Sequence, residues 1–470
     1  MKEFSSKIPG FEDCLSSADD TKYMAVNENA LPGIPQVLSE YFCGNGEKKC
    51  TGACFSDKNT FAAAGKEVQE ILYSSGINVG EGYIFENGIH ADYDHVETIK
   101  AQLKNILDNT KNSNRSVVVP IAVASGTIND LVKRAADEMG LPYLCVPTAA
   151  SVDGYTAYGS SILHEGFKQT MSCKAPLAVV ADSRILAAAP AYLSSSGFGD
   201  LAGKIIAGTD WIISDHVFEL DGKGELAPGL SVIDGTAWVM VQNDLKNSLS
   251  SSIKAAKGDR DAVKTLFIAL GITGFALQYM KDSRAVSGCE HMWSHVWEME
   301  NLCVDSIPVT HGHKVTMGTL AAAAFTECLF SEKPPLNKNI PEWATREKDI
   351  RKAFSSTKHI VPSILDKARG KFIDNKDKLE RLREGILDSW DSIKRDVFEK
   401  LPPYTELRSI LNEAGCPVKP ETINLTRKKV IESAAKAQMI RIRFTVLDLA
   451  FELGVFDKVL KKMESSEYFE

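Results

Sequence analysis

The feature that most constrains the fold is a run of nine almost entirely apolar residues, SVVVPIAVA at 116–124. A strand that is apolar on both faces predicts burial inside a parallel sheet. Shorter strand-like runs at 48–57, 79–85, 143–148 and 176–182 alternate with helical patterns at 60–72, 95–107 and 125–140. This alternation predicts an α/β domain with a parallel sheet over the first 190 residues.

After residue 190 the strand signals end and helical periodicity dominates. It predicts helices at 199–215, 259–281, 285–300, 313–330, 344–355, 377–398 and 438–461. A chain of 470 residues is too long for one hydrophobic core. We therefore expect two domains, an α/β domain at 1–190 and an all-α domain at 191–470.

Composition limits the class of partner and the compartment. The net charge is −8 without a block of Lys and Arg, which argues against nucleic acid as the main partner. The ten cysteines are scattered, as is typical of reduced thiols in a cytosolic protein. Neither a secretory signal nor a run of eighteen apolar residues is present, so we expect a cytoplasmic chain without a membrane span.

Two segments rich in small residues follow predicted strands. SGTIND at 125–130 begins a helix, whose free N–H groups can bind a phosphate, and Gly126 allows a close approach. PTAASVDGYTAYGS at 147–160 surrounds Asp153 with small residues, and Thr148 or Ser151 can donate to a ligand. Each segment can also be an ordinary tight turn or connection.

Four histidines fall within 23 positions. His291 and His295 are four residues apart and share one helical face, which suits metal binding. His311 and His313 stand just before the next predicted helix. A single histidine in such a place is more often a satisfied core residue, but the pairs favour a metal site.

An acid in SSSGFGDLAGK at 194–204 completes a possible ligand set. We expect Gly197 and Gly199 to bracket a turn that delivers Asp200 at the start of a helix. There Asp200 can simply favour the helix dipole. One Asp and two His from separate segments would form a three-ligand site with a position open to substrate.

These motifs, in this order, resemble the sn-glycerol-1-phosphate dehydrogenase family. That family is grouped with glycerol dehydrogenases, iron-containing alcohol dehydrogenases and dehydroquinate synthases. The resemblance runs from about residue 30 to 330, and FTVLDLAFELG at 444–454 resembles the bacterial branch. It implies a dehydroquinate synthase-like fold, with a Rossmann-like nicotinamide-binding domain and an all-α metal- and substrate-binding domain.

The resemblance also implies roles for individual residues. The metal ligands would be Asp200, His291 and His311, with His295 as a fourth catalytic residue that relays a proton because imidazole titrates near neutrality. The substrate would contact Asp153, Asp200 and His295. The cofactor-binding positions would be Asp57, Gly126, Thr127, Ile128, Asn129, Asp130, Thr148, Ala149, Ala150, Ser151 and Ala157. Lys204, Arg284 and His313 are candidates to neutralise a substrate phosphate.

The reaction implied is reduction of dihydroxyacetone phosphate to sn-glycerol 1-phosphate by NADH or NADPH, a step of phospholipid biosynthesis. The metal would be zinc, nickel or iron, and the assembly a homodimer or larger. Three positions depart from the family pattern: Ala122 and Ala124 replace glycines before the phosphate loop, and Ala157 replaces a serine. Asp57 favours NAD, since an acid repels a 2′-phosphate.

Three alternatives remain open at this point. Another polyol dehydrogenase would act on unphosphorylated glycerol. A dehydroquinate-synthase-like cyclase is disfavoured, because its first metal ligand is typically Glu. A non-catalytic binding protein that keeps the fold is supported only by the two alanines before the phosphate loop.

Overall fold

A computed structural model describes residues 9–110, 116–164 and 167–470. The chain forms two compact units. The first comprises residues 9–201 and 246–282, and the second comprises 202–245 and 283–470. The sequence suggested one boundary at 190/191, whereas the structure adds 191–201 and 246–282 to the first unit.

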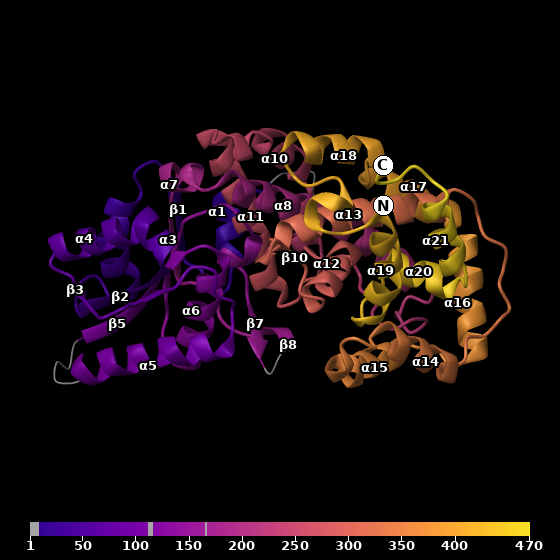
Figure 1. Cartoon of the computed structure of the whole chain (residues 1–470), viewed down its shortest axis with the longest axis horizontal. Coiled ribbons are helices and arrows are strands. Elements are labelled where there is room, and N and C mark those ends of the chain that lie inside the picture. Colours follow the sequence, from indigo (N-terminus) through magenta and orange to yellow (C-terminus); the bar gives the residue numbers. More distant parts are fainter. Residues whose placement is uncertain (1–8, 111–115, 165–166) are drawn as a thin grey trace. The chain divides into compact units, whose positions relative to one another are not determined.

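The first unit is built on a sheet of seven strands in the part of the chain described. The order is β1-β9-β6-β5-β2-β3, β4 also pairs with β2, and every pairing is parallel (Figure 1). The strands are β1 (Tyr23–Asn27), β2 (Lys49–Asp57), β3 (Asn78–Val79), β4 (Tyr83–Phe85), β5 (Ser116–Ala124), β6 (Leu144–Pro147) and β9 (Ala178–Asp182). The predicted parallel sheet is confirmed.

Helices cover both faces of this sheet. On one face α4 packs with alternate residues of β5, among them Val119, Ile121 and Val123. On the other face α5 and α6 pack against β5 and against each other. Side chains alternate along a strand, so a fully apolar β5 serves both layers.

The long helices of the first unit are α5 (Tyr93–Thr110), α6 (Gly126–Glu138), α11 (Arg260–Met280) and α8 (Ala191–Glu219), which begins here and continues into the second unit. The short ones are α1 (Phe11–Ser16), α2 (Ile34–Val37), α3 (Lys58–Thr60), α4 (Lys66–Ser74), α7 (Ser183–Ala188) and α10 (Leu245–Ser252). The 3₁₀ or π turns are η1 (Leu31–Gly33), η2 (Leu38–Phe42), η3 (Phe61–Gly65), η4 (Asp153–Tyr155) and η5 (Ala255–Lys257). An antiparallel hairpin, β7 (Ser160–His164) with β8 (Phe167–Met171), follows the 147–160 segment.

Among the residues described, one helix is long and apolar enough to cross a membrane, α11. In its most apolar window 61% is buried. It packs against α1, α7, β1 and η4 of its own unit. These contacts account for its apolar character as that of a core helix.

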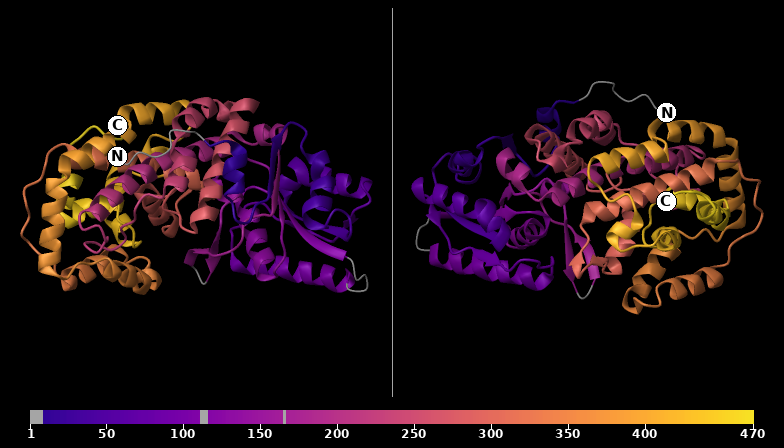
Figure 2. Two further views of the ribbon diagram at one scale, coloured as in Figure 1. Left: turned by 180° about the vertical axis from the view of Figure 1, so that it is seen from behind. Right: turned by 45° about the horizontal axis from the view of Figure 1, so that its top comes forward.

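The second unit is helical, apart from the two-stranded hairpin β10 (Cys303–Val304) with β11 (Ile307–Pro308), and Figure 2 shows its orange and yellow helices from two further sides. Besides the end of α8, its helices are α9 (Gly235–Gln242), α12 (Cys289–Met299), α13 (His311–Phe330), α14 (Trp343–Ala353), α15 (Val361–Gly370), α16 (Lys376–Asp388), α17 (Trp390–Lys400), α18 (Tyr404–Glu413), α19 (Arg427–Met439), α20 (Val446–Glu452) and α21 (Phe456–Glu464), with 3₁₀ turns η6 (Lys358–Ile360) and η7 (Pro420–Ile423). The predicted helical second half is confirmed.

Two predicted helices are wrong in extent. The stretch 377–398 is two helices that break at Ser389, because the buried Trp390 starts α17 in a new direction. The stretch 438–461 is the end of α19, then α20 and α21. Thr445 and Asp448 form a capping box that starts α20, and Gly454 with φ +69° ends it.

Candidate metal and cofactor site

Helix α12 carries its functional side chains along one stripe. His291, His295 and Glu298 follow one another at spacings of four and three, so they lie on one helical face. The opposite face holds Trp293 and Trp297, whose indole N–H groups donate to Val430 O and Ser433 Oγ of α19, both at 3.0 Å. The aromatic face fixes the rotation of α12, and this rotation sets the direction of the histidines.

The start of α12 is fixed by a buried acid on α8. Asp210 accepts from the backbone N–H of Cys289 at 2.7 Å and of Val446, the first residue of α20, at 2.8 Å. One carboxylate thus satisfies the open N-termini of two helices. Burial and the neighbouring Glu290 raise the pKa of Asp210 to about 7.

A carboxylate contacts Nδ1 of each histidine in the site. Glu290 Oε1 lies 2.6 Å from His291 Nδ1. Glu298 Oε1 lies 2.9 Å from His311 Nδ1, and its Oε2 lies 3.1 Å from His295 Nδ1. When Nδ1–H donates to a carboxylate, Nε2 is the atom left to bind a metal or a substrate.

His311 is the first residue of α13, so the helix begins earlier than the sequence predicted and includes both His311 and His313. Thr310 caps this helix by accepting the His313 backbone N–H at 3.3 Å. Helices α12 and α13 pack together within the second unit, and their histidine rings cluster. The ring centroid of His291 lies 5.2 Å from that of His311 and 6.2 Å from that of His295.

The prediction for Asp200 is wrong in its local structure. The segment 194–204 does not form a turn; it lies within α8, which begins at Ala191, and Asp200 stands inside the helix. The glycines serve packing instead. A Cβ at Gly197 would collide with the carbonyl oxygen of Ala150, and one at Gly203 would lie 2.7 Å from Val315 Cγ1 and 3.4 Å from Glu290 Cγ.

Gly203 thereby explains how α8 reaches the histidines. It follows Asp200 by three residues, so both lie on the same side of α8. The contacts of Gly203 with Val315 of α13 and Glu290 of α12 bring that side of α8 close to both helices. Asp200 is fully buried, and its Oδ2 accepts the backbone N–H of Asp153 at 3.0 Å.

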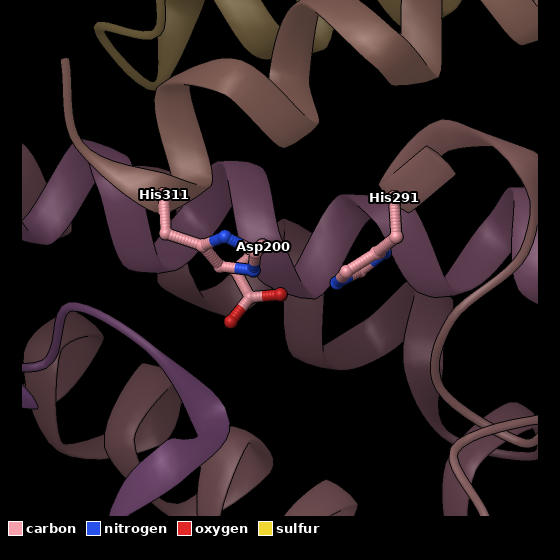
Figure 3. Close-up of side chains that lie close together, drawn as sticks. All are labelled: Asp200, His291 and His311. Atoms are coloured by element: carbon pink, nitrogen blue, oxygen red, sulfur yellow. The ribbon is translucent and has the colours of Figure 1, made fainter. Parts of the chain in front are cut away.

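Asp200, His291 and His311 come together. One ligand atom from each lies within 4.8 Å of the other two, and Figure 3 shows a nitrogen of each imidazole turned toward the Asp200 carboxylate. Asp200 is buried, the His291 side chain is 8% exposed and that of His311 is 27% exposed. One carboxylate and two oriented imidazoles suit a divalent transition metal with a further position open.

The protonation of His295 differs from the sequence expectation. Burial lowers the pKa of His295 to about 3, and the positive charge of Arg441 lowers it further, while the hydrogen bond to Glu298 opposes both. Burial also lowers the pKa of His313 to about 4. Burial therefore favours the neutral form of both rings.

The carboxyl ends of β2, β5 and β6 meet at one edge of the sheet in the first unit. The register pairs Phe55 with Ala122 and Ala124 with Pro147. Asp57, Gly126 and Thr148 consequently leave the sheet at the same edge. The strand order reverses between β2 and β5: after β2 the chain continues to β3 and β4 on one side, and after β5 it continues to β6 and β9 on the other. Ligands of open parallel sheets bind at such a switch point.

A buried lysine holds the 147–160 segment against α6. Lys133 is fully buried, and its ammonium donates to the carbonyls of Gly154, Ala157 and Gly159 at 2.7, 3.0 and 3.0 Å. The three N–H donors of the ammonium group thus match the three carbonyl acceptors. These bonds from α6 hold the turn that carries Asp153 and Ala157 in place.

Several predicted cofactor residues are engaged inside the first unit. Asn129 is buried, donates to Gly154 O at 3.3 Å and accepts from Tyr143 Oη at 3.2 Å. Asp130 Oδ2 accepts the Ser161 N–H at 3.3 Å, and Ser151 Oγ lies 3.0 Å from Tyr155 Oη. These side chains shape the edge, so any contact of Asn129 or Asp130 with a cofactor would come from the backbone.

The remaining predicted positions are simpler to place. Gly126, Thr127 and Ile128 form the first turn of α6, and the Ser125 side chain makes no capping bond there. Ala149 and Ala150 are buried. Asp57 caps α3 by accepting the Thr60 N–H at 2.8 Å.

The phosphate candidates are all interior groups. Lys204 is fully buried and Arg284 is 8% exposed. Arg284 Nη2 donates to Gly229 O at 2.6 Å. The structure therefore gives these two side chains, and the partly buried His313, a place in the second unit without assigning them a ligand.

Sequence reasoning missed the charged residues that hold the site. Glu298 follows His295 by three positions, a spacing at which helical side chains meet, and that signal was available. Lys133, Glu290 and Asp210 carried no comparable signal. The partners of Lys133 and Asp210 are backbone groups that the fold brings close, whereas Glu290 contacts the adjacent His291.

Residues 25–190 match the iron-containing alcohol dehydrogenase family. This match covers all the strands of the sheet but β1's first two residues, together with the 125–130 and 147–160 segments. This part of the chain is therefore similar to that family. A nicotinamide nucleotide and a metal ion are the cofactors that the similarity implies.

Individual relatives extend the likeness. The chain is 33% identical to a glycerol-1-phosphate dehydrogenase [NAD(P)+] of Bacillus velezensis over 57% of its length, which spans 64% of that relative. It is 27% identical to one of Halalkalibacterium halodurans over 90% of both chains. Glycerol dehydrogenase from Schizosaccharomyces pombe shares the fold, with a TM-score of 0.55, 15% identity and coverage of 96% and 93%.

Proposed function

We propose that this chain is a metal-dependent sn-glycerol-1-phosphate dehydrogenase that uses NADH or NADPH to reduce dihydroxyacetone phosphate. The observation that carries the proposal is the convergence of Asp200, His291 and His311, with ligand atoms within 4.8 Å of one another. The activity for which the bacterial relatives are named supplies the substrate class. The relatives and the donor set support the same reaction from independent directions.

Asp200, His291 and His311 would hold the metal, which when bound polarises a substrate carbonyl. Zinc, nickel and iron all suit one carboxylate and two imidazoles. Glu290 and Glu298 keep Nδ1 of the two ligand histidines engaged, so each ring offers Nε2. This second layer of carboxylates is typical of sites that bind transition metals.

The nicotinamide would supply the hydride, while the chain orients and shields the reactants. The first turn of α6 would offer its N–H groups to the pyrophosphate, and Thr148 and Ser151 would contact the cofactor at the same edge. Asp153 and His295 would contact the substrate. The reduction needs a proton at the substrate oxygen, and because burial lowers the pKa of His295, this ring would deliver a proton only while taking up another.

Assay of the purified chain tests the proposal. Chelated protein would be supplied with Zn²⁺, Ni²⁺ or Fe²⁺ in turn and assayed with dihydroxyacetone phosphate and each cofactor, and the product stereochemistry would be determined. We expect metal-dependent formation of sn-glycerol 1-phosphate. Equal turnover of unphosphorylated dihydroxyacetone would favour a glycerol dehydrogenase, and failure to bind either cofactor would favour a non-catalytic protein. A cytoplasmic location, a homodimer and a part in phospholipid biosynthesis stay predictions.

A further inference from the structure

One buried carboxylate serves two histidines with different predicted roles. The Glu298 side chain is 6% exposed and lies on the last turn of α12. Its two oxygens are divided between the predicted metal ligand His311, at 2.9 Å, and the predicted substrate residue His295, at 3.1 Å. The geometry ties the orientation of both rings to a single side chain.

A lysine also lies beside this carboxylate. Lys314 Nζ lies 3.4 Å from Glu298 Oε1, and its side chain is only 8% exposed. Lys314 stands one turn after His311 on α13, so the same helix supplies both the imidazole and the cation. An ionised carboxylate accepts at both oxygens and cannot donate.

We propose that Glu298 is a positioning residue that fixes His311 and His295 in the same tautomer, with hydrogen on Nδ1 and Nε2 directed into the site. The inference rests on the proposed function for the roles of the two rings. It predicts that Glu298 governs two separable quantities, metal affinity through His311 and turnover through His295. A merely structural glutamate would change neither quantity in a folded protein.

Glu298→Gln is the decisive variant, because an amide has one acceptor oxygen and its NH₂ group opposes the second Nδ1–H. We expect a 10- to 100-fold loss of metal affinity, measured by competition with a chromophoric chelator, an effect of about the size found for such outer carboxylates. At saturating metal, kcat should also fall while KM for the cofactor stays unchanged. Glu298→Asp, which keeps the carboxylate, should restore part of both losses.

Glu300→Gln is the matched control. Glu300 lies two residues further on and pairs with Lys429 at 2.8 Å and Lys436 at 2.6 Å. The same chemical change at the same end of α12 should leave metal affinity and kcat as in the wild type. A comparable loss in both variants would mean that the end of α12 is merely sensitive to charge.

A His295→Ala background separates the two roles. There, Glu298→Gln should still weaken metal binding fully, through His311, but should lower kcat much less than in the wild type. Wild-type metal affinity and kcat in a folded Glu298→Gln protein would overturn the inference. If the wild type fails to reduce dihydroxyacetone phosphate, the proposed function fails, but the chelator competition still tests Glu298 against His311.

Discussion

In each unit a buried charged side chain holds several groups of the candidate site, but the two units use it differently. In the first unit the Lys133 ammonium holds three backbone carbonyls of the 154–159 turn. In the second unit the Glu298 carboxylate holds two imidazoles and a lysine. The cation orders main chain, whereas the anion orders side chains.

The difference matches what each site must present. A dinucleotide is bound largely by backbone N–H groups and by close approach of the main chain, so the part of the protein that must be held in place is a loop. A metal is bound by side-chain atoms whose tautomer matters, so the fixed objects are rings. Damage to Lys133 should therefore affect the cofactor, and damage to Glu298 should affect the metal.

Asp200 is where this division should break down, and its loss should have the largest effect. Its carboxylate lies beside the ligand histidines and also accepts the Asp153 N–H. Asp200→Ala should abolish stoichiometric metal binding and lower kcat/KM by about 10³-fold, since a whole ligand is lost. Metal content by mass spectrometry and steady-state assays measure both effects.

Asp200→Asn refines this prediction. The amide can still accept from Asp153 N–H but supplies no charge to a metal, so metal affinity should fall while cofactor affinity stays near the wild-type value. A stoichiometric metal in either variant, together with normal turnover, would remove Asp200 from the ligand set.

Lys133→Met should have the next largest effect, and we expect it to impair cofactor binding by the first unit. The methionine fills similar volume but removes the donor to three carbonyls and the cation beside Asp130, at a cost of about 3–5 kcal/mol in the free energy of unfolding. NADH affinity, followed by fluorescence, should weaken while chelator competition reports unchanged metal affinity. Lys66→Met, at an exposed lysine of α4, is the control.

Reversed effects would contradict the comparison. If Lys133→Met weakened metal binding as much as cofactor binding, the 154–159 turn would not be the object that Lys133 orders. Lys133→Arg offers a second check, because a planar guanidinium cannot match three carbonyls arranged around one ammonium.

Much of this arrangement could be predicted from local sequence. The apolar run of β5 and the small residues after it placed the sheet and the α6 turn, and the His291–His295 spacing placed the metal face of α12. The prediction that Asp200 lies beside the histidines is correct, but the turn that was expected to bring it there does not form. Its two glycines resemble a loop in sequence, and only the crossing of α8 with its neighbours shows that they permit close packing inside a helix.

The supporting charges were out of reach for a physical reason. Lys133 binds main-chain carbonyls more than twenty residues away, and carbonyls carry no sequence signal. Asp210 joins backbone groups at 289 and 446. The helix breaks near 389 and 440 were missed because the helical spacing of apolar residues continues in the sequence before and after each break.

The pH dependence of the free energy of unfolding can show whether a buried carboxyl group of the second unit, Glu452, destabilises the fold when it is charged. Glu452, on α20, is 6% exposed, and burial together with Asp448 raises its pKa to about 8. The unfolded chain loses this proton near pH 4.5, so the folded state binds more protons between pH 4.5 and 8. Stability should then fall as pH rises through this window, by on the order of 4 kcal/mol at pH 8.

Glu452→Gln should remove that slope. Urea unfolding at pH 5.5 and pH 8 should show the variant matching the wild type at the lower pH and exceeding it at the higher one. An identical fall in both proteins would assign the slope to another group, for example Asp210, whose pKa is also raised.

The smallest expected effect concerns Asp57, which has two tasks at the edge of the first unit. It caps α3 through Thr60 at 2.8 Å, and it stands at the carboxyl end of β2, where a cofactor ribose would lie. Asn is as good an N-cap as Asp but has no charge. Asp57→Asn should therefore improve KM for NADPH relative to NADH several-fold without loss of stability, whereas Asp57→Ala should make the same shift and lose about 1 kcal/mol. An unchanged cofactor ratio in both variants, with only the alanine destabilised, would reduce Asp57 to a helix cap and leave the backbone that Lys133 orders as the main determinant of cofactor binding.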